Sequence, residues 1–215
     1  MPTNTMKQQW FMIKQIRPHV YAIAEFRHFQ KTVMYLVVLK NNAILFDTGM
    51  GKRSIHKVIQ TITKLPIIVF LTHSHWDHIG GLLKSDAVYS FANVKDRQKI
   101  IIDSIPIQLI STPGHTPDSV CYYLPTFKIL ILGDTFYPGP LYAHMPESNI
   151  QDYAWSLSLI GRIASVKTLL LPGHNAITCD YLMIKKAAAL MKKVAMTTKS
   201  GLHEVKGDGF SILLP

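Results

Sequence analysis

The sequence is poor in cysteine and has no long apolar run, no repeat and no low-complexity stretch. Its two cysteines, Cys121 and Cys179, belong to no paired-cysteine motif, which excludes a disulfide framework. No segment is apolar for long enough to span a membrane, and residues 1–17 lack the continuous apolar core of a signal peptide. These absences agree with each other, and we expect a cytoplasmic protein that is not bound to a membrane.

The chain also lacks a linker. At 215 residues it suits a single domain over residues 1–215. A domain of this size buries a sizeable core without disulfides or metals for stability. A metal, if the chain binds one, would therefore serve catalysis rather than folding.

Acidic residues are scarce: 13 Asp and Glu stand against 23 Lys and Arg, for a net charge of +10 and a pI near 9.6. Such a balance could attract nucleic acid, anionic lipid or a small anionic substrate. The densest basic segment contains Lys185, Lys186, Lys192, Lys193 and Lys199 on what reads as one amphipathic helix, without aromatic residues to stack on bases. We interpret these lysines as a solvated helix face, and a nucleic-acid partner stays an alternative.

The spacing of apolar residues predicts many short strands, with helices between and after them. The predicted strands are 10–13, 20–24, 33–39, 43–46, 67–71, 87–90, 107–110, 120–124, 128–132, 168–171 and 210–214. The predicted helices are 54–63, a short one after residue 81, 150–164 and 181–196. Residues 91–104 show no readable pattern, and 139–146 read as a loop over a site.

One stretch concentrates residues that bind metals. His73 and His75 lie two positions apart, so in an extended or tightly turned segment both imidazoles project the same way, as two ligands of one ion require. Asp77 and His78 are adjacent and diverge, so they can serve a second ion beside the first. The apolar run 67–71 delivers this cluster to a strand end, and the two glycines that follow let the backbone turn closely around it.

Three more predicted core strands end in a His or an Asp beside glycine or proline. These residues are His115, Asp134 and His174. A single Pro-Gly-His sequence carries little information, but its repetition after apolar strands does. Strand ends at one edge of stacked sheets can converge in space, so we expect one site built from all four ends.

This order of ligands resembles the motif of the metallo-β-lactamase superfamily, His-x-His-x-Asp-His followed by a lone His, a lone Asp and a final His. The matching residues are His73, His75, Asp77, His78, His115, Asp134 and His174. The resemblance spans most of the chain. It implies an α/β protein with an αββα sandwich, in which two mixed β-sheets are flanked by helices. It also implies a hydrolase, and we place the chain near the glyoxalase II and lactonase-like branch.

The same resemblance assigns roles to the ligands. It gives one ion His73, His75 and His115, gives the other Asp77, His78 and His174, and places Asp134 between the two. Asp47, in the sequence Asp-Thr-Gly, looks like a residue that supports the ligands without binding metal. The implied cofactors are two Zn²⁺ per chain, although iron or manganese would also accept imidazole and carboxylate ligands.

The implied chemistry is hydrolysis by a hydroxide held between the two ions, with Asp77 as a ligand that also orients this nucleophile. A bridging Asp134 rather than a cysteine, and the absence of a secretion signal, disfavour an exported β-lactamase. The single long helix after His174 is too little for the glutathione-binding region of a standard glyoxalase II, and no RNA-binding arm of the tRNase Z type is visible.

We therefore predict cleavage of an ester-type bond, a lactone or a thioester, in a small substrate. A phosphodiesterase or ribonuclease acting on nucleic acid, a β-lactam hydrolase and a catalytically silent metal-binding scaffold stay open as alternatives.

Tyr137 is the residue that points towards a lactone. It lies three positions after Asp134, a spacing that resembles acyl-homoserine lactone lactonases, in which such a tyrosine contacts the substrate carbonyl. We assign it a catalytic role, with a core or loop tyrosine as the alternative. Apolar residues in 139–146 indicate an uncharged or acyl substrate portion, and His144 is the one histidine outside the motif that this loop could bring to the site.

Overall fold

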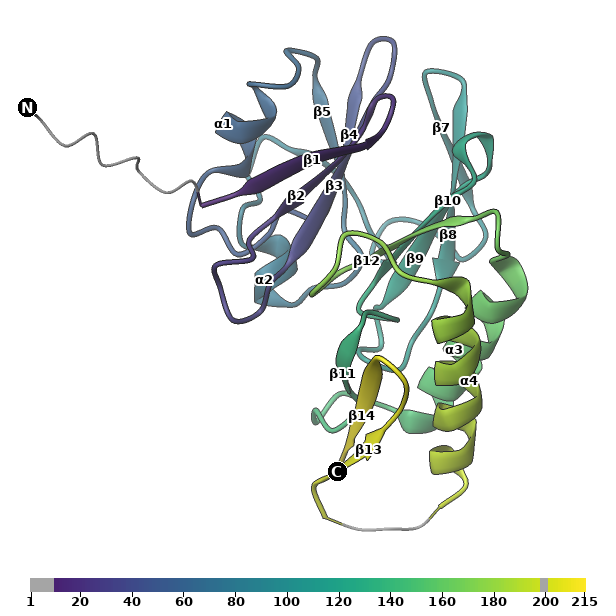
Figure 1. Ribbon diagram of the computed structural model, residues 1–215. Helices are drawn as coiled ribbons and strands as arrows, with labels where there is room; N and C mark the ends of the chain where they lie inside the picture. Colours follow the sequence, from purple (N-terminus) through teal and green to yellow (C-terminus); the bar gives the residue numbers. More distant parts are fainter. Residues whose placement is uncertain (1–9, 198–200) are drawn as a thin grey trace, which may run out of the picture.

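The computed structural model describes residues 10–197 and 201–215, and most of this chain forms two β-sheets packed face to face (Figure 1). The first sheet contains, in order, β1 (Met12–Arg17), β2 (Val20–Ala24), β3 (Val33–Val38), β4 (Ala43–Phe46), β5 (Ile67–Phe70) and β6 (Ala87–Tyr89). The second contains β12 (Leu169–Pro172), β10 (Ile129–Gly133), β9 (Val120–Leu124), β8 (Ile105–Ser111) and β7 (Lys99–Ile102). Both sheets are mixed, because β4 to β6 run parallel and β10 runs parallel to β12, whereas the other pairs are antiparallel.

Alternation along the strands explains why the sheets stack. In β3, Tyr35 and Val37 face the core between the two sheets, whereas Met34 and Leu36 belong to a separate core on the other side. That other side is covered by the short helix α1 (Ile55–Ile59). A strand buried on both faces reads as a continuous apolar run, as β3 does.

The outer face of the second sheet is covered by α3 (Ile150–Ile163) and α4 (Tyr181–Ala195), which lie together on the side away from the first sheet (Figure 1). Asn149 caps α3 by accepting a hydrogen bond from the Asp152 amide at 3.0 Å, and Asp180 caps α4 in the same way. The layers are therefore helix, sheet, sheet, helix, which confirms the predicted αββα sandwich. The four lysines of α4 are solvent-exposed, as expected, and Lys199 lies outside the described residues.

A third, small sheet was not expected. It has the order β11-β14-β13, formed by Gly139–Tyr142, Phe210–Leu214 and His203–Lys206. The prediction that 139–146 is a loop is therefore wrong for its first four residues. Pro140 has no backbone N–H to donate, but β11 tolerates it because its partner within the described chain is β14 alone.

Other predicted boundaries shift. Residues 91–104 contain β7, in which Ile100 is buried and Ile101 exposed. The helix predicted over 54–63 ends at Ile59, before the β-branched run 61–63, whose side chains lose rotamer freedom in a helix. The predicted short helix is α2 (Trp76–Ile79), which lies inside the ligand stretch rather than after it.

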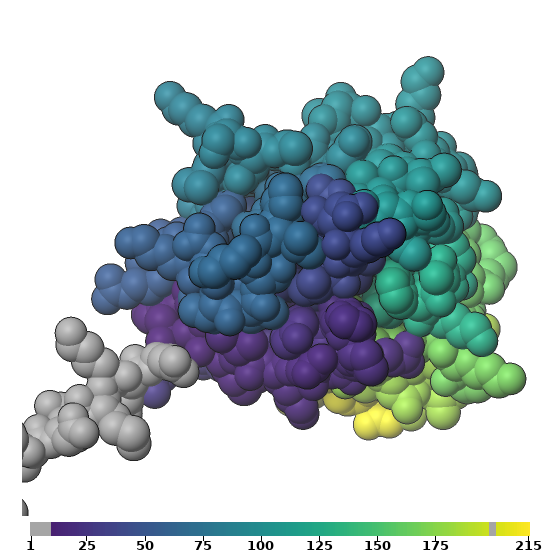
Figure 2. All heavy atoms as spheres, turned by 90° about the horizontal axis from the view of Figure 1, so that it is seen from above, coloured from purple at the N-terminus to yellow at the C-terminus, as the bar shows by residue number. Residues whose placement is uncertain are grey.

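Seen from above, the purple and blue residues of the first sheet fill the left and centre of the molecule, and the green residues, which include α3 and α4, lie on the right (Figure 2). Within the described ranges no helix is both long and apolar enough to cross a bilayer. Residues 1–9, over which we expect no signal peptide, and residues 198–200 lie outside the described part of the chain.

Candidate metal centre

Four strand ends meet at one edge of the sandwich. Residues 73–78 follow β5 of the first sheet, and His115, Asp134 and His174 follow β8, β10 and β12 of the second. Their side-chain nitrogen and oxygen atoms form three overlapping groups, each within 4.8 Å. The predicted convergence of the strand ends is thus confirmed, and all seven predicted ligands come together.

Two glycines permit this close approach. A Cβ atom at Gly173 would lie 2.6 Å from Oδ1 of Asp134, and one at Gly81 would lie 2.4 Å from the carbonyl oxygen of Thr48. Real side chains do not approach so closely, so a substituted residue at either position would displace the site.

His73, His75 and His115 form one cluster, which we call the three-histidine group. Nδ1 of His75 lies 3.0 Å from Nε2 of His115. The ring centre of His73 lies 4.7 Å from that of His75 and 5.3 Å from that of His115. The three imidazoles therefore surround one small space, as the spacing of the first two predicts.

Asp77, His78 and His174 form the second cluster, the Asp77 group. Nε2 of His78 lies 3.1 Å from Nε2 of His174, and Oδ2 of Asp77 lies 3.6 Å from the latter. Asp134 stands between the groups. Its Oδ1 lies 3.2 Å from His78 Nε2 and 3.1 Å from His174 Nε2, whereas its Oδ2 lies 3.6 Å from His115 Nε2. One carboxylate thus presents one oxygen to each group.

Each of the five imidazoles binds a partner through the nitrogen that points away from the site. For His73, His78, His115 and His174 this nitrogen is Nδ1, and the partners are Thr72 Oγ1 at 3.1 Å, Asp47 Oδ2 at 2.8 Å, the Tyr142 carbonyl at 2.9 Å and the Gln30 carbonyl at 2.6 Å. For His75 it is Nε2, which lies 2.9 Å from Oε1 of Glu147. Carbonyl and carboxylate oxygens only accept, so these rings donate outward, and the second nitrogen of each ring faces the site, where it can bind a metal ion when the ring is neutral.

Asp47 supports both groups from behind. Its carboxylate accepts from the Thr72 amide and the Thr72 hydroxyl, both at 2.8 Å, and from Nδ1–H of His78. Since the Thr72 proton goes to Asp47, Nδ1 of His73 must be the donor to Thr72, which leaves Nε2 free. Asp47 is buried and has a φ of +60°, a conformation that Asp tolerates better than most residues.

The donor set fits divalent metal ions. Nε2 of His73 and Oδ1 of Asp134 are buried and lack a hydrogen-bond partner in the described chain, which is costly unless an ion satisfies them. Two nitrogens that each bind zinc at about 2.0–2.1 Å in a tetrahedral site are roughly 3.3 Å apart. The facing nitrogen pairs, at 3.0 and 3.1 Å, are close to that spacing.

Burial and neighbouring charges set the protonation of the site. Burial lowers the pKa of His73 well below its usual value, and burial also lowers the pKa of His115. Burial opposes the charge of His78, but Asp134 and Asp47 outweigh it and raise the pKa of His78. Burial would raise the pKa of Asp134, but His174 and His78 outweigh it and hold that pKa well below its usual value. Asp134 is therefore an ionised carboxylate.

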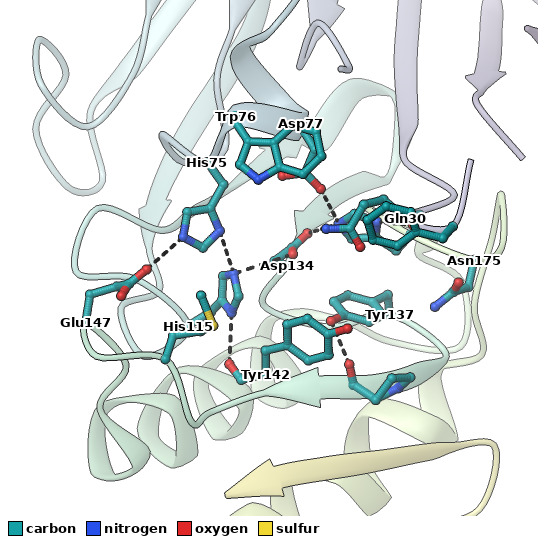
Figure 3. Close-up of a pocket in the computed structure, with 14 residues that line it drawn as sticks. Gln30, His75, Trp76, Asp77, His115, Asp134, Tyr137, Tyr142, Glu147 and Asn175 are labelled. Carbon is teal, nitrogen blue, oxygen red and sulfur yellow. Dashed lines mark hydrogen bonds and ion pairs between the residues drawn. The ribbon is translucent and has the colours of Figure 1, made fainter. Parts of the chain in front are cut away.

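A pocket of about 420 Å³ opens onto the site (Figure 3). The residues that line it are Phe29, Gln30, His75, Trp76, Asp77, His115, Asp134, Tyr137, Pro140, Tyr142, Met145, Glu147, His174 and Asn175. Phe29 is 76% exposed and Trp76 is 51% exposed, so the wall formed by the 25–32 connection and α2 offers aromatic surface to a ligand. The volume suits a small molecule.

Tyr137 lies in this pocket, with its ring 4.9 Å from that of His174. Its hydroxyl donates to the Pro140 carbonyl at 2.7 Å. Burial, followed by the charge of Asp134, raises the pKa of Tyr137 well above its usual value, so the hydroxyl keeps its proton. His144 is not among the residues that line the pocket; its ring lies edge-on to that of Tyr142, with the ring centres 5.2 Å apart.

Sequence reasoning missed several residues of this site. Glu147 lies beyond the predicted ligands, and Gln30 and Phe29 come from the 25–32 connection between β2 and β3. Nothing in their spacing marks them, because they contact the site through loops whose path depends on the packing of both sheets. Tyr142 lies in the segment 139–146 that was expected over the site, but its bond to His115 was not predicted. Trp76 was visible within the ligand stretch but carried no signal of its own.

Comparison with known proteins agrees with this architecture. The family model described as "Metallo-beta-lactamase superfamily" matches residues 29–99. A solved structure of a metallo-β-lactamase from Pontibacter korlensis superposes with a TM-score of 0.71 at 17% identity, covering 85% of this chain and 99% of that one. The chain therefore has the metallo-β-lactamase fold, and the family model matches part of the first sheet and the ligand stretch that follows it.

The curated relatives either match only part of their own length or share a low sequence identity with this chain. A lactamase-like protein of Pestalotiopsis microspora is 30% identical over 57% of this chain, and this match covers 45% of that protein. An acyl-coenzyme A thioesterase of Gallus gallus, MBLAC2, is 23% identical over 77% of this chain and 81% of its own length. The chain thus spans less than half of the first relative but most of the second.

Proposed function

We propose that the protein is a metal-dependent hydrolase that cleaves an ester-type bond, a lactone or a thioester, in a small substrate. The observation that carries this proposal is the seven-residue constellation, in which each of the five imidazoles donates outward through one nitrogen and turns its other nitrogen towards a shared space. Such preorganisation is expected of a metal centre and has no use in an apolar core.

The ligand sets follow from the two groups. We propose that the three-histidine group holds one ion, that the Asp77 group holds the other, and that Asp134 contributes one oxygen to each. Zinc is the ion that we favour, and iron or manganese would fit the same donors. When bound, such ions supply a water of lowered pKa and an electrophile for the substrate oxygen.

Two residues of the chain are placed to orient the attacking water and the substrate. Oδ2 of Asp77 faces His174, whereas no described residue hydrogen-bonds to its Oδ1, which is thus able to accept a hydrogen bond from the attacking water. Tyr137 keeps its proton and can turn its hydroxyl from the Pro140 carbonyl to the substrate oxygen that gains charge. We assign catalytic roles to these two residues.

The substrate class follows from the walls of the pocket. Phe29, Trp76 and Met145 offer apolar surface around a polar floor, which suits an acyl or other uncharged portion next to the bond that breaks. The match to an acyl-coenzyme A thioesterase over most of both chains favours a thioester among the ester-type bonds. The glyoxalase II and lactonase-like branches remain part of the same proposal.

A substrate panel tests this function. Zinc-loaded protein is assayed with acyl-coenzyme A and glutathione thioesters, a series of lactones, a β-lactam and a phosphodiester, with protein that has been stripped by a chelator as the control. We expect turnover of a thioester or a lactone that is lost on stripping and restored by zinc. Turnover of the phosphodiester or the β-lactam alone would replace the proposal by one of its alternatives, and no metal-dependent turnover would leave a binding scaffold.

A further inference from the structure

Among the partners of the five imidazoles, one differs from the rest. The His73, His78, His115 and His174 rings bind backbone carbonyls or the buried side chains of Thr72 and Asp47. The fifth ring, that of His75, binds the carboxylate of Glu147, whose side chain is 37% exposed. Glu147 is thus the one charged partner that stands in solvent.

His75 is also the least confined of the five rings. Its side chain is 24% exposed, whereas those of His78, His115 and His174 are 0%, 2% and 6% exposed. A ring with fewer packing contacts depends more on its hydrogen bond for orientation. The bond to Oε1 of Glu147 fixes Nε2 as the protonated nitrogen and so turns Nδ1 towards His115.

The segment that carries Glu147 is itself fixed to the site. The Ser148 hydroxyl donates to the His115 carbonyl at 2.8 Å, and the Asn149 amide donates to the Gly114 carbonyl at 2.8 Å. These two bonds flank Glu147 on its C-terminal side and tie it to the loop that carries a second member of the three-histidine group. Figure 3 shows Glu147 reaching across from this segment to His75. The carboxylate is therefore held in place by more than a flexible surface contact.

We propose that Glu147 is a positioning residue for His75, and that it sets the metal affinity of the three-histidine group without affecting the Asp77 group. The inference rests on the metal binding in the proposed function. Glu147 acts through the imidazole and touches no member of the Asp77 group. Loss of such a carboxylate partner typically costs about 10- to 100-fold in metal affinity.

Zinc titration in competition with a chromogenic chelator tests the proposal, because it reports the affinity of each ion without any assay of hydrolysis. The variants are Glu147→Ala, which removes the acceptor, and Glu147→Gln, which keeps an acceptor oxygen but removes the charge. Asp152→Asn is the matched control. It also removes one negative charge from an exposed side chain, five positions further along the chain, that contacts none of the predicted metal ligands.

We expect the unaltered protein to bind two zinc ions. In Glu147→Ala the affinity for one of them should fall by about 10- to 100-fold, and in Glu147→Gln the affinity for the same ion should fall by a smaller factor. The control should match the unaltered protein, and thermal unfolding of all metal-free variants should coincide. In a His75→Ala background, Glu147→Ala should have no further effect on zinc binding.

Other results overturn the inference in distinguishable ways. Equal loss of both ions, or a shift in metal-free unfolding that accounts for the loss, would assign Glu147 a general structural role. Unchanged affinities would show that its contact with His75 is incidental, while the metal centre itself stands. A protein that binds no zinc at all would remove the basis of the proposed function together with this inference.

Discussion

The two ligand groups use the same kinds of side chain but are supported differently. The Asp77 group lies against Asp47, whose carboxylate is 3% exposed and accepts three hydrogen bonds at 2.8 Å. The three-histidine group shares this support through Thr72, which binds His73, but its member His75 is held by Glu147, whose side chain is 37% exposed. Buried support is part of the folded core, whereas exposed support can be removed without unfolding the protein. The comparison teaches that the support of His78 is tied to the stability of the fold and that the support of His75 is not.

Removal of a ligand from each group is the strongest test of this comparison. His78→Ala empties a fully buried position beside Asp47, and we expect loss of hydrolysis to background, of about one ion and of stability. His75→Ala should also reduce hydrolysis to background and lose about one ion, but leave the metal-free fold intact. Metal analysis and urea unfolding of chelator-treated protein measure the difference. If both variants lose equal stability, the distinction between the groups is wrong.

Asp47→Asn should have the next largest effect. Asn offers one amide oxygen to these three donors, and its new NH₂ group would point at one or two of them, so we expect a loss of roughly 3 kcal/mol in the free energy of unfolding without metal. Urea denaturation measures it.

Asp103→Asn is the matched control. Asp103 also has a positive φ and accepts from Asn41 and Asn42, but it lies at a solvated turn. An equal loss in the free energy of unfolding in the two variants would mean that the burial of Asp47 behind the ligands does not increase its contribution to stability.

A third comparison concerns two tyrosines that line the same pocket, and the variants that test it are Tyr137→Phe and Tyr142→Phe. Deletion of the Tyr137 hydroxyl should lower turnover by on the order of a hundredfold with metal content unchanged, because one donor to the developing charge is lost. Tyr142→Phe keeps the carbonyl that binds His115, so we expect a smaller loss. Steady-state kinetics on the best substrate of the panel decides between them.

The Tyr142 hydroxyl has no hydrogen-bond partner within the described chain, whereas that of Tyr137 is already engaged with Pro140. A larger loss in Tyr142→Phe would therefore move the donor role from one tyrosine to the other. Loss of metal in either variant would instead indicate damage to the ligands.

The smallest expected effect is that of salt. Turnover of an uncharged ester depends on the pocket and not on the net charge of +10, so a rise from 50 to about 200 mM salt should change kcat/KM less than threefold. Steep salt dependence, together with cleavage of RNA, would favour the nucleic-acid alternative over the small substrate.

Most of the fold and the site could be predicted from the chain. The resemblance to the metallo-β-lactamase superfamily implied the αββα sandwich, apolar spacing predicted a compatible order of strands and helices, and all seven predicted ligands lie together. Strand β11 and the partners Glu147 and Tyr142 could not be predicted. β11 contains Gly139 and Pro140, which locally favour a loop, and is a strand because β14 pairs with it from more than 60 residues away. The single domain over 1–215, the metal assignments and the role of Tyr137 stay predictions.

The sequence by itself determined which atoms are available to bind metal. His73, His75, Asp77 and His78 are placed by their spacing after one buried strand, since adjacent positions on a short segment leave little conformational choice. Only the tertiary structure decided how each ring is oriented. Asp47 and Glu147 are 31 and 72 residues from the imidazoles that they bind, and no local rule connects positions so far apart. Their hydrogen bonds exist because two sheets pack face to face and bring distant loops to one edge, and that packing leaves Asp47 buried and Glu147 partly exposed.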